Sequence, residues 1–322
     1  MPRRRQNRAL ALGAAGVGAG LAATAAFQAA RRHRNRALDL AELRLPNALT
    51  HHHVTVDDGA VIHTVENGHG RPLVLLHGVT LSIETWPYQI ATLSKHFRVI
   101  ALDQRGHGRS QRGSGGYGIA RMASDAAQVL THLDISDAVV VGHSMGGMVT
   151  QQMCLDFPDL ARQRVAGTIL LSTAAAVSPG IPGLSAVNRV ANPGVLTRAT
   201  GRGFPAGDVG YALARLAVGT NADPRHVAHT RNMTAAVPPA TLAALMPGVI
   251  GFDIRSRLKD YPVPALVITG SRDLLTPPRL GRDIARRIPG AEFEVVSGAG
   301  HMLMMERAEW LNDRIAAFAR DH

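Results

Sequence analysis

The sequence predicts an α/β protein in which a mostly parallel, twisted sheet carries helices on both faces and a helical cap is inserted. Three observations predict this fold. Short, continuous apolar runs recur along the chain, helical patterns separate several of them, and one long interval lacks a convincing central strand. The chain has 322 residues, which is long enough for one large α/β domain with an insertion.

Segments of strand length come first. Residues 54–56 and 60–65 flank Asp57-Asp58-Gly59, which is typical of a hairpin turn. The later runs are continuous and apolar, as expected of strands buried on both faces, and they occupy residues 72–76, 97–102, 138–141, 167–171, 265–269 and 292–296. Helical patterns lie between several of these runs, notably at residues 124–133 and 279–288. This repetition favours parallel strands with helices on both faces.

The interval at about residues 178–259 breaks this repetition. It holds many Pro and Gly residues and only short amphipathic pieces, at residues 209–218 and 241–245. We interpret it as a helical cap inserted between two core strands. The expected organisation is an N-terminal segment at residues 1–36 and one domain at residues 37–322 that contains this cap.

The N-terminal segment accounts for most of the net positive charge. Of a formal net charge of +11, eight positive charges are arginines within residues 1–36, which hold no acid, so the rest of the chain has about +3. No basic stripe interleaved with aromatic residues is present, so we expect no nucleic-acid binding. Residues 9–30 are uncharged and long enough to span a bilayer, although they are rich in Gly and Ala.

Three interpretations of residues 9–30 compete. We expect a membrane anchor, because arginine clusters flank the apolar run on both sides. A cleaved signal peptide is the second interpretation, with Ala23-Thr24-Ala25 as a weak small-x-small site. The third is a loosely helical tail without a membrane role. The three correspond to a membrane-anchored, a secreted and a cytoplasmic protein.

Neither a disulfide nor a metal site is predicted. Cys154 is the single cysteine, so no intrachain disulfide can form. His51-His52-His53 begins a predicted strand, where neighbouring side chains point to alternating faces, and no acidic or Cys partner lies near in sequence. We therefore expect no metal and no cofactor.

The clearest chemical motif is Gly142-His143-Ser144-Met145-Gly146, a G-x-S-x-G pattern. It follows the apolar run at residues 138–141 and precedes a helical pattern at residues 148–157, the strand–turn–helix context that exposes a nucleophilic serine. Gly142 and Gly146 lack the side chains that would collide in so tight a bend. The alternative is a Gly/Ser turn without chemistry. We predict that Ser144 is a nucleophile.

A serine hydroxyl needs a general base at neutral pH. His301, in a small-residue loop after the predicted strand at 292–296, is the candidate base. Asp273, just after the strand at 265–269, is the candidate acid that would orient the imidazole. Each residue alone could be an exposed loop residue. The order Ser, Asp, His at three strand ends nevertheless favours a catalytic triad.

Two further loops follow predicted strands. His77-Gly78-Val79 follows residues 72–76, and we assign an oxyanion hole to the backbone N–H groups of Val79 and Met145. His77, Gly78, Gly142 and Gly146 would support it. The loop at residues 103–110 looks chemical, but we interpret it as structural. Gly106 and Gly108 permit a tight turn whose polar groups Asp103 and Arg105 can satisfy.

Together these motifs resemble the α/β-hydrolase superfamily, in its serine-nucleophile, esterase- or lipase-like branch. The resemblance covers nearly all of the chain beyond the N-terminal segment and rests on His77-Gly78, residues 103–110, residues 142–147, residues 270–273 and Gly300-His301. It implies the α/β-hydrolase fold. Haloalkane dehalogenases and epoxide hydrolases normally carry Asp where Ser144 stands, which counts against both.

The expected function is hydrolysis of a carboxylic ester, or of a related small apolar acyl substrate, through an acyl-enzyme intermediate. Thioester, lactone or carbon–carbon bond hydrolysis and cofactor-free haloperoxidase activity stay open, because the predicted cap carries no motif. A non-catalytic binding protein on the same fold is the alternative from another class. The sequence indicates no oligomeric state.

Overall fold

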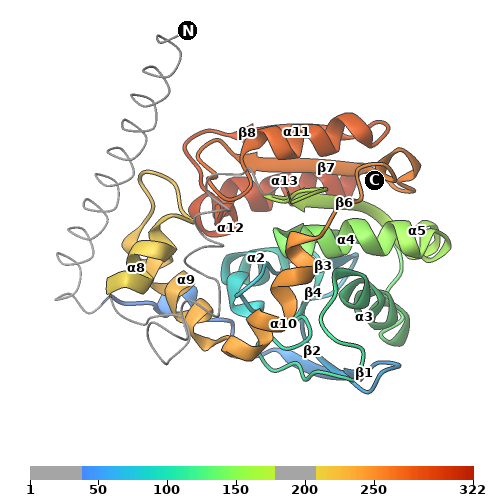
Figure 1. Ribbon diagram of the computed structural model, residues 1–322, viewed down its shortest axis with the longest axis horizontal. Coiled ribbons are helices and arrows are strands. Elements are labelled where there is room, and N and C mark those ends of the chain that lie inside the picture. The colour runs from blue at the N-terminus through green and yellow to red at the C-terminus, as the bar shows by residue number, and fades with distance from the viewer. Residues whose placement is uncertain (1–37, 178–207) are drawn as a thin grey trace, which may run out of the picture.

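The computed structural model describes residues 38–177 and 208–322, which surround one eight-stranded sheet (Figure 1). The strand order is β1-β2-β4-β3-β5-β6-β7-β8. β2 pairs antiparallel with β1 and with β4, and all other neighbouring strands are parallel. The predicted mostly parallel sheet is therefore confirmed.

The strands agree closely with the apolar runs. They are β1 (Thr50–Thr55), β2 (Val61–Asn67), β3 (Pro72–Leu76), β4 (Arg98–Leu102), β5 (Ala138–His143), β6 (Val165–Leu171), β7 (Ala265–Gly270) and β8 (Glu292–Val296). β1 begins four residues before the predicted run at residues 54–56, and it includes His51-His52-His53, which were expected to begin a strand. There the ladder pairs Thr50 with Glu66 and His53 with His63, and this long-range pairing holds three histidines in a strand that their own propensities do not indicate.

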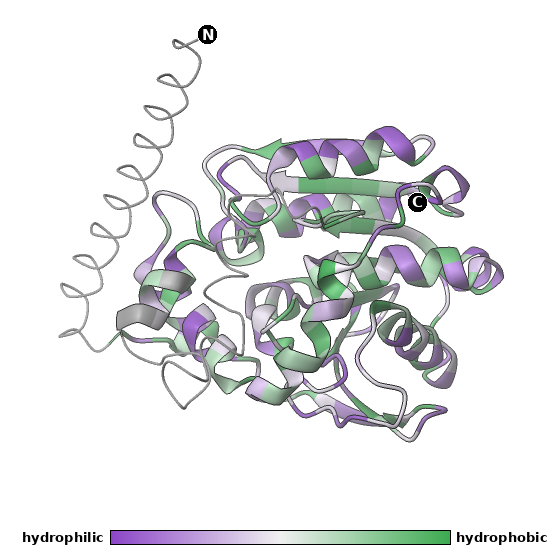
Figure 2. Ribbon diagram, viewed as in Figure 1, coloured by the Kyte–Doolittle hydropathy of each residue, from purple (hydrophilic) through white to green (hydrophobic). Residues whose placement is uncertain are grey.

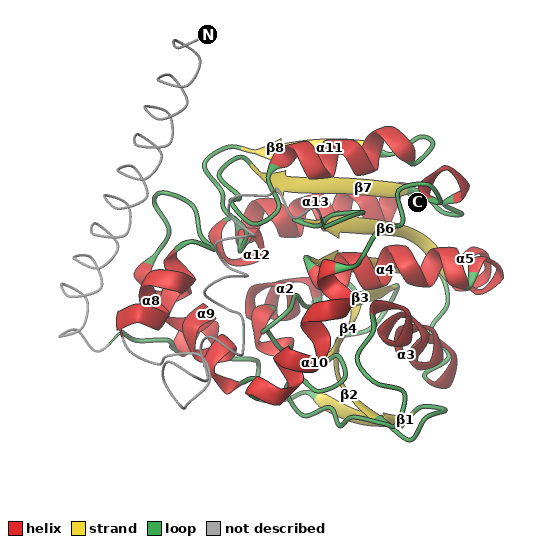
Figure 3. Cartoon of the chain, viewed as in Figure 1, coloured by secondary structure: helices red, strands yellow, loops and turns green. Residues whose placement is uncertain are grey.

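Helices cover both faces of the sheet (Figure 3). They are α2 (Pro87–Leu93), α3 (Ile119–His132), α4 (Met145–Asp156), α5 (Pro158–Arg164), α8 (Asp208–Arg215), α9 (Pro224–Ala236), α10 (Pro239–Ile250), α11 (Pro278–Arg287), α12 (Leu303–Glu306) and α13 (Ala308–Asp321), with short 3-10 turns η1 (Ala41–Leu43), η2 (Ile83–Thr85) and η3 (Leu258–Asp260). Figure 2 shows green apolar residues along the strands and purple residues on the outer sides of the helices.

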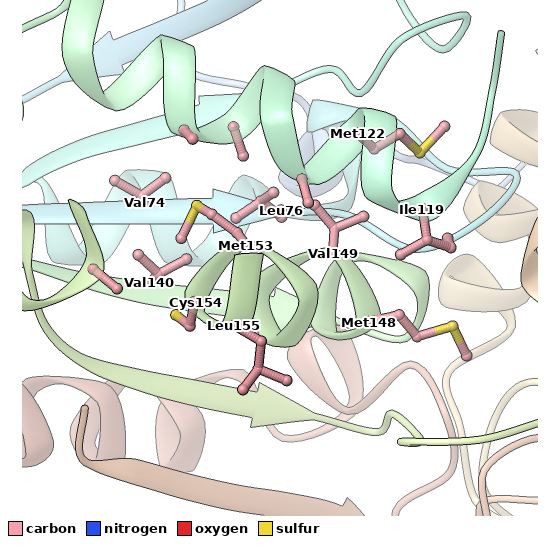
Figure 4. Packing of buried hydrophobic residues seen from close by; sticks show 14 of the residues in the cluster. Val74, Leu76, Ile119, Met122, Val140, Met148, Val149, Met153, Cys154 and Leu155 are labelled. Atoms are coloured by element: carbon pink, nitrogen blue, oxygen red, sulfur yellow. The ribbon is translucent and has the colours of Figure 1, made fainter. Parts of the chain in front are cut away.

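The central strand β3 shows why both faces need cover. Val74 and Leu76 point into an apolar cluster with α3 and α4 (Figure 4), whereas Leu73 and Leu75 point into the opposite cluster with α2 and α13. All four side chains are buried. Each contributes about 1.5–3 kcal/mol by leaving water, so helices are stabilised on both sides of the sheet.

Helices α8, α9 and α10 lie between β6 and β7, within the interval interpreted as a cap. The predicted pieces at residues 209–218 and 241–245 correspond to α8 and α10. Residues 178–207 of that interval, and the apolar run at residues 9–30, lie outside the described residues. Among the residues that are described, no single helix is long and apolar enough to cross a bilayer. Helices α9 and α10 have the required length and composition only when they are taken together, and the two are bent by 99° relative to each other.

Candidate active site

The predicted nucleophile lies between β5 and α4. Ser144 has φ 53° and ψ −117°, a backbone conformation that an L-residue adopts only under strain. A side chain on Gly142 would meet the Gly146 carbonyl oxygen at 2.5 Å, and a side chain on Gly146 would overlap the carbonyl oxygen of Leu76. Both glycines of the motif are therefore required by close approach of the backbone.

Hydrogen bonds hold Ser144 in this conformation. Its N–H donates to the Leu171 carbonyl at 2.9 Å, which ties the turn to the end of β6. Its carbonyl accepts from the Thr173 hydroxyl at 2.6 Å and from the Gly147 N–H at 3.0 Å. α4 begins immediately after it, three residues earlier than the helical pattern suggested, so the partial positive charge of the helix N-terminus lies beside the hydroxyl.

His301 and Asp273 come from two loops at the same edge of the sheet. Both are buried, and His301 Nδ1 lies 2.9 Å from Asp273 Oδ2. Burial by itself would raise the pKa of Asp273, but the His301 ring and hydrogen bonds from Thr276 hold this pKa below its ordinary value. An ionised carboxylate only accepts hydrogen bonds, so Nδ1 carries a proton and Nε2 of the neutral ring keeps the lone pair.

The structure thus joins Asp273 to His301 directly. Within the described residues, no hydrogen bond links the Ser144 hydroxyl to the His301 ring. Such bonds are often long before substrate binds. The neighbour of the serine, His143, does contact His301. Its Nε2–H donates to the His301 carbonyl at 2.9 Å, and the centroids of the two rings lie 4.7 Å apart. Burial holds the pKa of His143 well below its ordinary value, so its ring is neutral.

The loop after β3, to which the oxyanion hole was assigned, packs against Ser144. A side chain on Gly78 would lie 3.1 Å from Ser144 Cβ, so this loop packs directly against the serine. His77 accepts the Gln104 N–H at Nε2, at 2.9 Å, and therefore donates from Nδ1 to the Gly78 carbonyl, at 2.7 Å. Burial lowers the pKa of His77, which keeps the ring neutral.

The two assigned oxyanion donors have backbone N–H groups that are available. Val79 N–H makes no backbone hydrogen bond to a described residue. Met145 is the first residue of α4, and the first N–H groups of a helix have no intrahelical acceptor.

Two residues at the site were missed by sequence reasoning. Thr276 donates from Oγ1 to Asp273 Oδ2 at 2.7 Å, and its Oγ1 lies 3.2 Å from His301 Nδ1. Glu306 accepts from the Gly219 N–H at 2.7 Å and from the Gly300 N–H at 3.1 Å. Thr276 has a local signal, because Asp-x-x-Thr is a turn motif. Glu306 has no such local signal for its bond to Gly219, since the two residues are distant in sequence.

The segment between β6 and β7 also contacts His301. The Ala217 carbonyl, just after α8, accepts from the N–H groups of both His301 and Met302, at 2.9 and 3.0 Å. Glu306 adds the second link between the two segments. The position of His301 therefore depends on the interval interpreted as a cap.

The loop at residues 103–110 is structural, as predicted. Gly106 and Gly108 have φ of 74° and 51°, and Asp103 accepts the Arg109 N–H at 3.0 Å. Arg105 is buried and bonded to Asp125 at 2.6 Å and to Asp58 at 2.8 Å.

Of the three adjacent histidines, His51 and His52 form hydrogen bonds, and the His53 ring centroid lies 5.3 Å from that of His63. Asp103 binds His63, and His63 Nε2 meets His51 Nδ1 at 2.9 Å. His52, on the other face of β1, bonds to Glu66 at 3.1 Å. In the part of the chain that the structure describes, no group of three His, Cys, Asp or Glu side chains has an arrangement that could hold a metal ion.

Several known proteins are similar to this chain in sequence or in structure. The sequence model of the alpha/beta hydrolase fold matches residues 71–308. A dihydrolipoyllysine-residue acetyltransferase component of an acetoin cleaving system, from Pseudomonas putida, is 34% identical over 266 residues. The aligned region covers 79% of this chain but only 64% of that protein, so this chain spans less than two thirds of its length.

Two solved structures are similar over most of the chain. Est816, an N-acyl homoserine lactone degrading enzyme, has a TM-score of 0.70 and 30% identity, and the match covers 83% of this chain and 99% of that one. A thermophilic esterase from Thermogutta terrifontis has a TM-score of 0.71 and 29% identity, covering 84% and 98%. Such relatives support hydrolase activity. With the family match over residues 71–308, they show that this chain belongs to the α/β-hydrolase fold family.

Proposed function

We propose that this chain is a serine hydrolase that cleaves a carboxylic ester, with Ser144 as nucleophile, His301 as general base and Asp273 as the residue that orients it. The observation that carries the proposal is the buried 2.9 Å hydrogen bond between His301 Nδ1 and Asp273 Oδ2, beside a strained serine at a helix N-terminus. This bond directs the lone pair of Nε2 away from Asp273, as a base for a serine requires.

The proposed reaction has two halves. His301 Nε2 takes the hydroxyl proton as Ser144 Oγ attacks the carbonyl carbon, and the backbone N–H groups of Val79 and Met145 stabilise the oxyanion that forms. The imidazolium then gives its proton to the departing alkoxide, which leaves an acyl group on Ser144. Water, deprotonated by the same base, releases the acid and restores the serine.

Lactone hydrolysis is the second candidate. The observation that favours it is the 30% identity to an N-acyl homoserine lactone degrading enzyme. A lactone would yield one hydroxy acid, whereas an open ester yields an acid and an alcohol. The same residues would act in both reactions, and the amphipathic helix α8 and the apolar helix α10 would select between small acyl substrates.

A fluorophosphonate probe tests the nucleophile, since it forms a covalent bond only with an activated serine. We expect wild-type protein to be labelled and Ser144→Ala to lose both labelling and ester turnover while remaining folded. Ser172→Ala is the matched control, because Ser172 is also buried, has φ 45° and lies at the end of the adjacent strand β6. A folded Ser144→Ala protein that still turned over esters would contradict the assignment.

A panel of open esters of increasing acyl length, with N-acyl homoserine lactones of the same lengths, separates the two candidates. Preference for the open esters by kcat/KM supports the leading proposal, and preference for lactones supports the second. An unlabelled wild-type protein that binds an acyl compound without turnover would favour the non-catalytic alternative.

We also propose that the uncharged run at residues 9–30 attaches the protein to a membrane. The proposal is supported by the length of this run and by the arginines on both sides of it. Full-length protein should sediment with membranes and resist high salt, whereas a protein beginning at Ala37 should be soluble and fully active on a water-soluble ester. Release by salt alone would indicate surface electrostatics, and a mature N-terminus near Ala26 would indicate secretion.

A further inference from the structure

We propose that Thr276 is a positioning residue that shares the Nδ1 proton of His301 with Asp273. The inference rests on the proposed triad and adds a fourth member to it. The three polar groups form a closed triangle: Thr276 Oγ1 to Asp273 Oδ2 at 2.7 Å, Asp273 Oδ2 to His301 Nδ1 at 2.9 Å, and His301 Nδ1 to Thr276 Oγ1 at 3.2 Å.

The protons of this triangle can be assigned. Asp273 is ionised and donates nothing, so the Thr276 hydroxyl proton goes to Asp273 Oδ2. The lone pairs of Thr276 Oγ1 then accept, and the only proton available to them in the triangle is that on His301 Nδ1. One N–H therefore faces two acceptors, of which Asp273 is the nearer.

Thr276 is itself held in place. Its backbone N–H donates to Asp273 Oδ1 at 2.8 Å, next to the Leu275 N–H at 2.9 Å, so both carboxylate oxygens are occupied. The residue is only 6% exposed, which excludes water as a substitute for its hydroxyl. Without that hydroxyl, Asp273 Oδ1 would still accept two backbone N–H groups, but Oδ2 would keep only His301 as a partner, and His301 Nδ1 would lose its second acceptor.

This geometry predicts a kinetic effect and not a binding effect. Thr276 acts through the base, so its hydroxyl should influence kcat and leave KM unchanged. Thr276→Val, which is nearly isosteric, should lower kcat about tenfold, the size expected from one lost buried hydrogen bond. Thr276→Ser keeps the hydroxyl and should restore most of the rate.

A purely structural role would look different. Thr168→Val is the matched control, because Thr168 is also buried and hydrogen-bonded, to the Pro264 carbonyl and the Tyr261 hydroxyl, in the middle of β6, outside the hydrogen bonds of the site. It should lower the midpoint of thermal unfolding without changing kcat. Should Thr276→Val fail to fold, Thr276→Ala removes the same hydroxyl without adding a branched methyl group.

The deciding measurement is proton NMR of ¹⁵N-histidine-labelled protein, which reports the Nδ1 proton of His301 without need of a substrate. We expect Thr276→Val to shift this resonance and speed its exchange with water, Thr276→Ser to leave both near the wild-type values, and kcat to follow. An unchanged resonance and an unchanged rate would overturn the inference. A shifted resonance in a protein that neither reacts with fluorophosphonate nor cleaves esters would refute the proposed function alone.

Discussion

A buried histidine beside the proposed oxyanion loop should make this protein sensitive to acid. His107 packs edge-on against His77, the residue that holds the Gly78 loop, with ring centroids 5.2 Å apart. Burial, helped by His77, lowers the pKa of His107 to about 3, although Asp103 and the Arg105 carbonyl act in the opposite direction. His107 is therefore neutral in the folded protein at pH values where an unfolded chain would be protonated.

The sign and size of the effect follow from linkage. Below an unfolded pKa of about 6.5 the unfolded chain binds the proton and the folded chain does not, so stability falls as pH falls, until the folded pKa near 3 is reached. Between pH 7 and pH 5, His107 should lower the free energy of unfolding by about 2 kcal/mol. The full loss, near pH 3, should be about 5 kcal/mol.

Urea denaturation of wild-type protein and His107→Asn at pH 7 and pH 5 measures this contribution. The asparagine amide can replace the Nδ1–H that donates to the Arg105 carbonyl at 3.1 Å, but it does not titrate. We expect the variant to lose about 2 kcal/mol less than the wild type over this interval. His132→Asn is the control, because His132 is exposed and also bonds a backbone carbonyl, that of Gln128. It should lose as much stability as the wild type between pH 7 and pH 5. Parallel pH profiles for wild type and His107→Asn would refute the reasoning.

Two further predictions concern the site. Asp273→Asn should lower kcat by about 10⁴ without preventing folding, because an amide that donates to His301 favours the wrong tautomer. Steady-state kinetics would measure the rate and circular dichroism the folding. A loss in kcat below tenfold would mean that another group orients the base. Gly146→Ala should cost about 3 kcal/mol or more in urea denaturation, because the new methyl group overlaps the Leu76 carbonyl. Gly248→Ala is its control, since the nearest atom there is 3.5 Å away, and equal stability of the two variants would contradict the close approach.

Much of the fold could be read from local pattern. Strand β3 coincides with a predicted run because a strand buried on both faces needs an unbroken apolar segment. Strand β8 also coincides with its predicted run, although it is an edge strand in which Glu292 and Val295 are exposed. The apolar run at residues 54–56 marks only the second half of β1, because the histidines of the first half pair with β2 through the ladder and carry no apolar pattern. The start of α4 was placed too late, because two glycines in its first turn weaken a helical pattern that the tight turn itself imposes.

The sequence by itself determined the strand–turn–helix around Ser144, the placement of Asp273 and His301 in loops after successive strands, and the mostly parallel sheet. These follow from short-range apolar periodicity and from glycines that a tight bend requires. Only the tertiary structure decided which groups are bonded around them: Thr276 to both Asp273 and His301, and Glu306 to Gly219. A buried polar group must find its partner among whatever the fold brings near, and 158 residues separate His143 from the His301 carbonyl that it bonds, so no local pattern could indicate it.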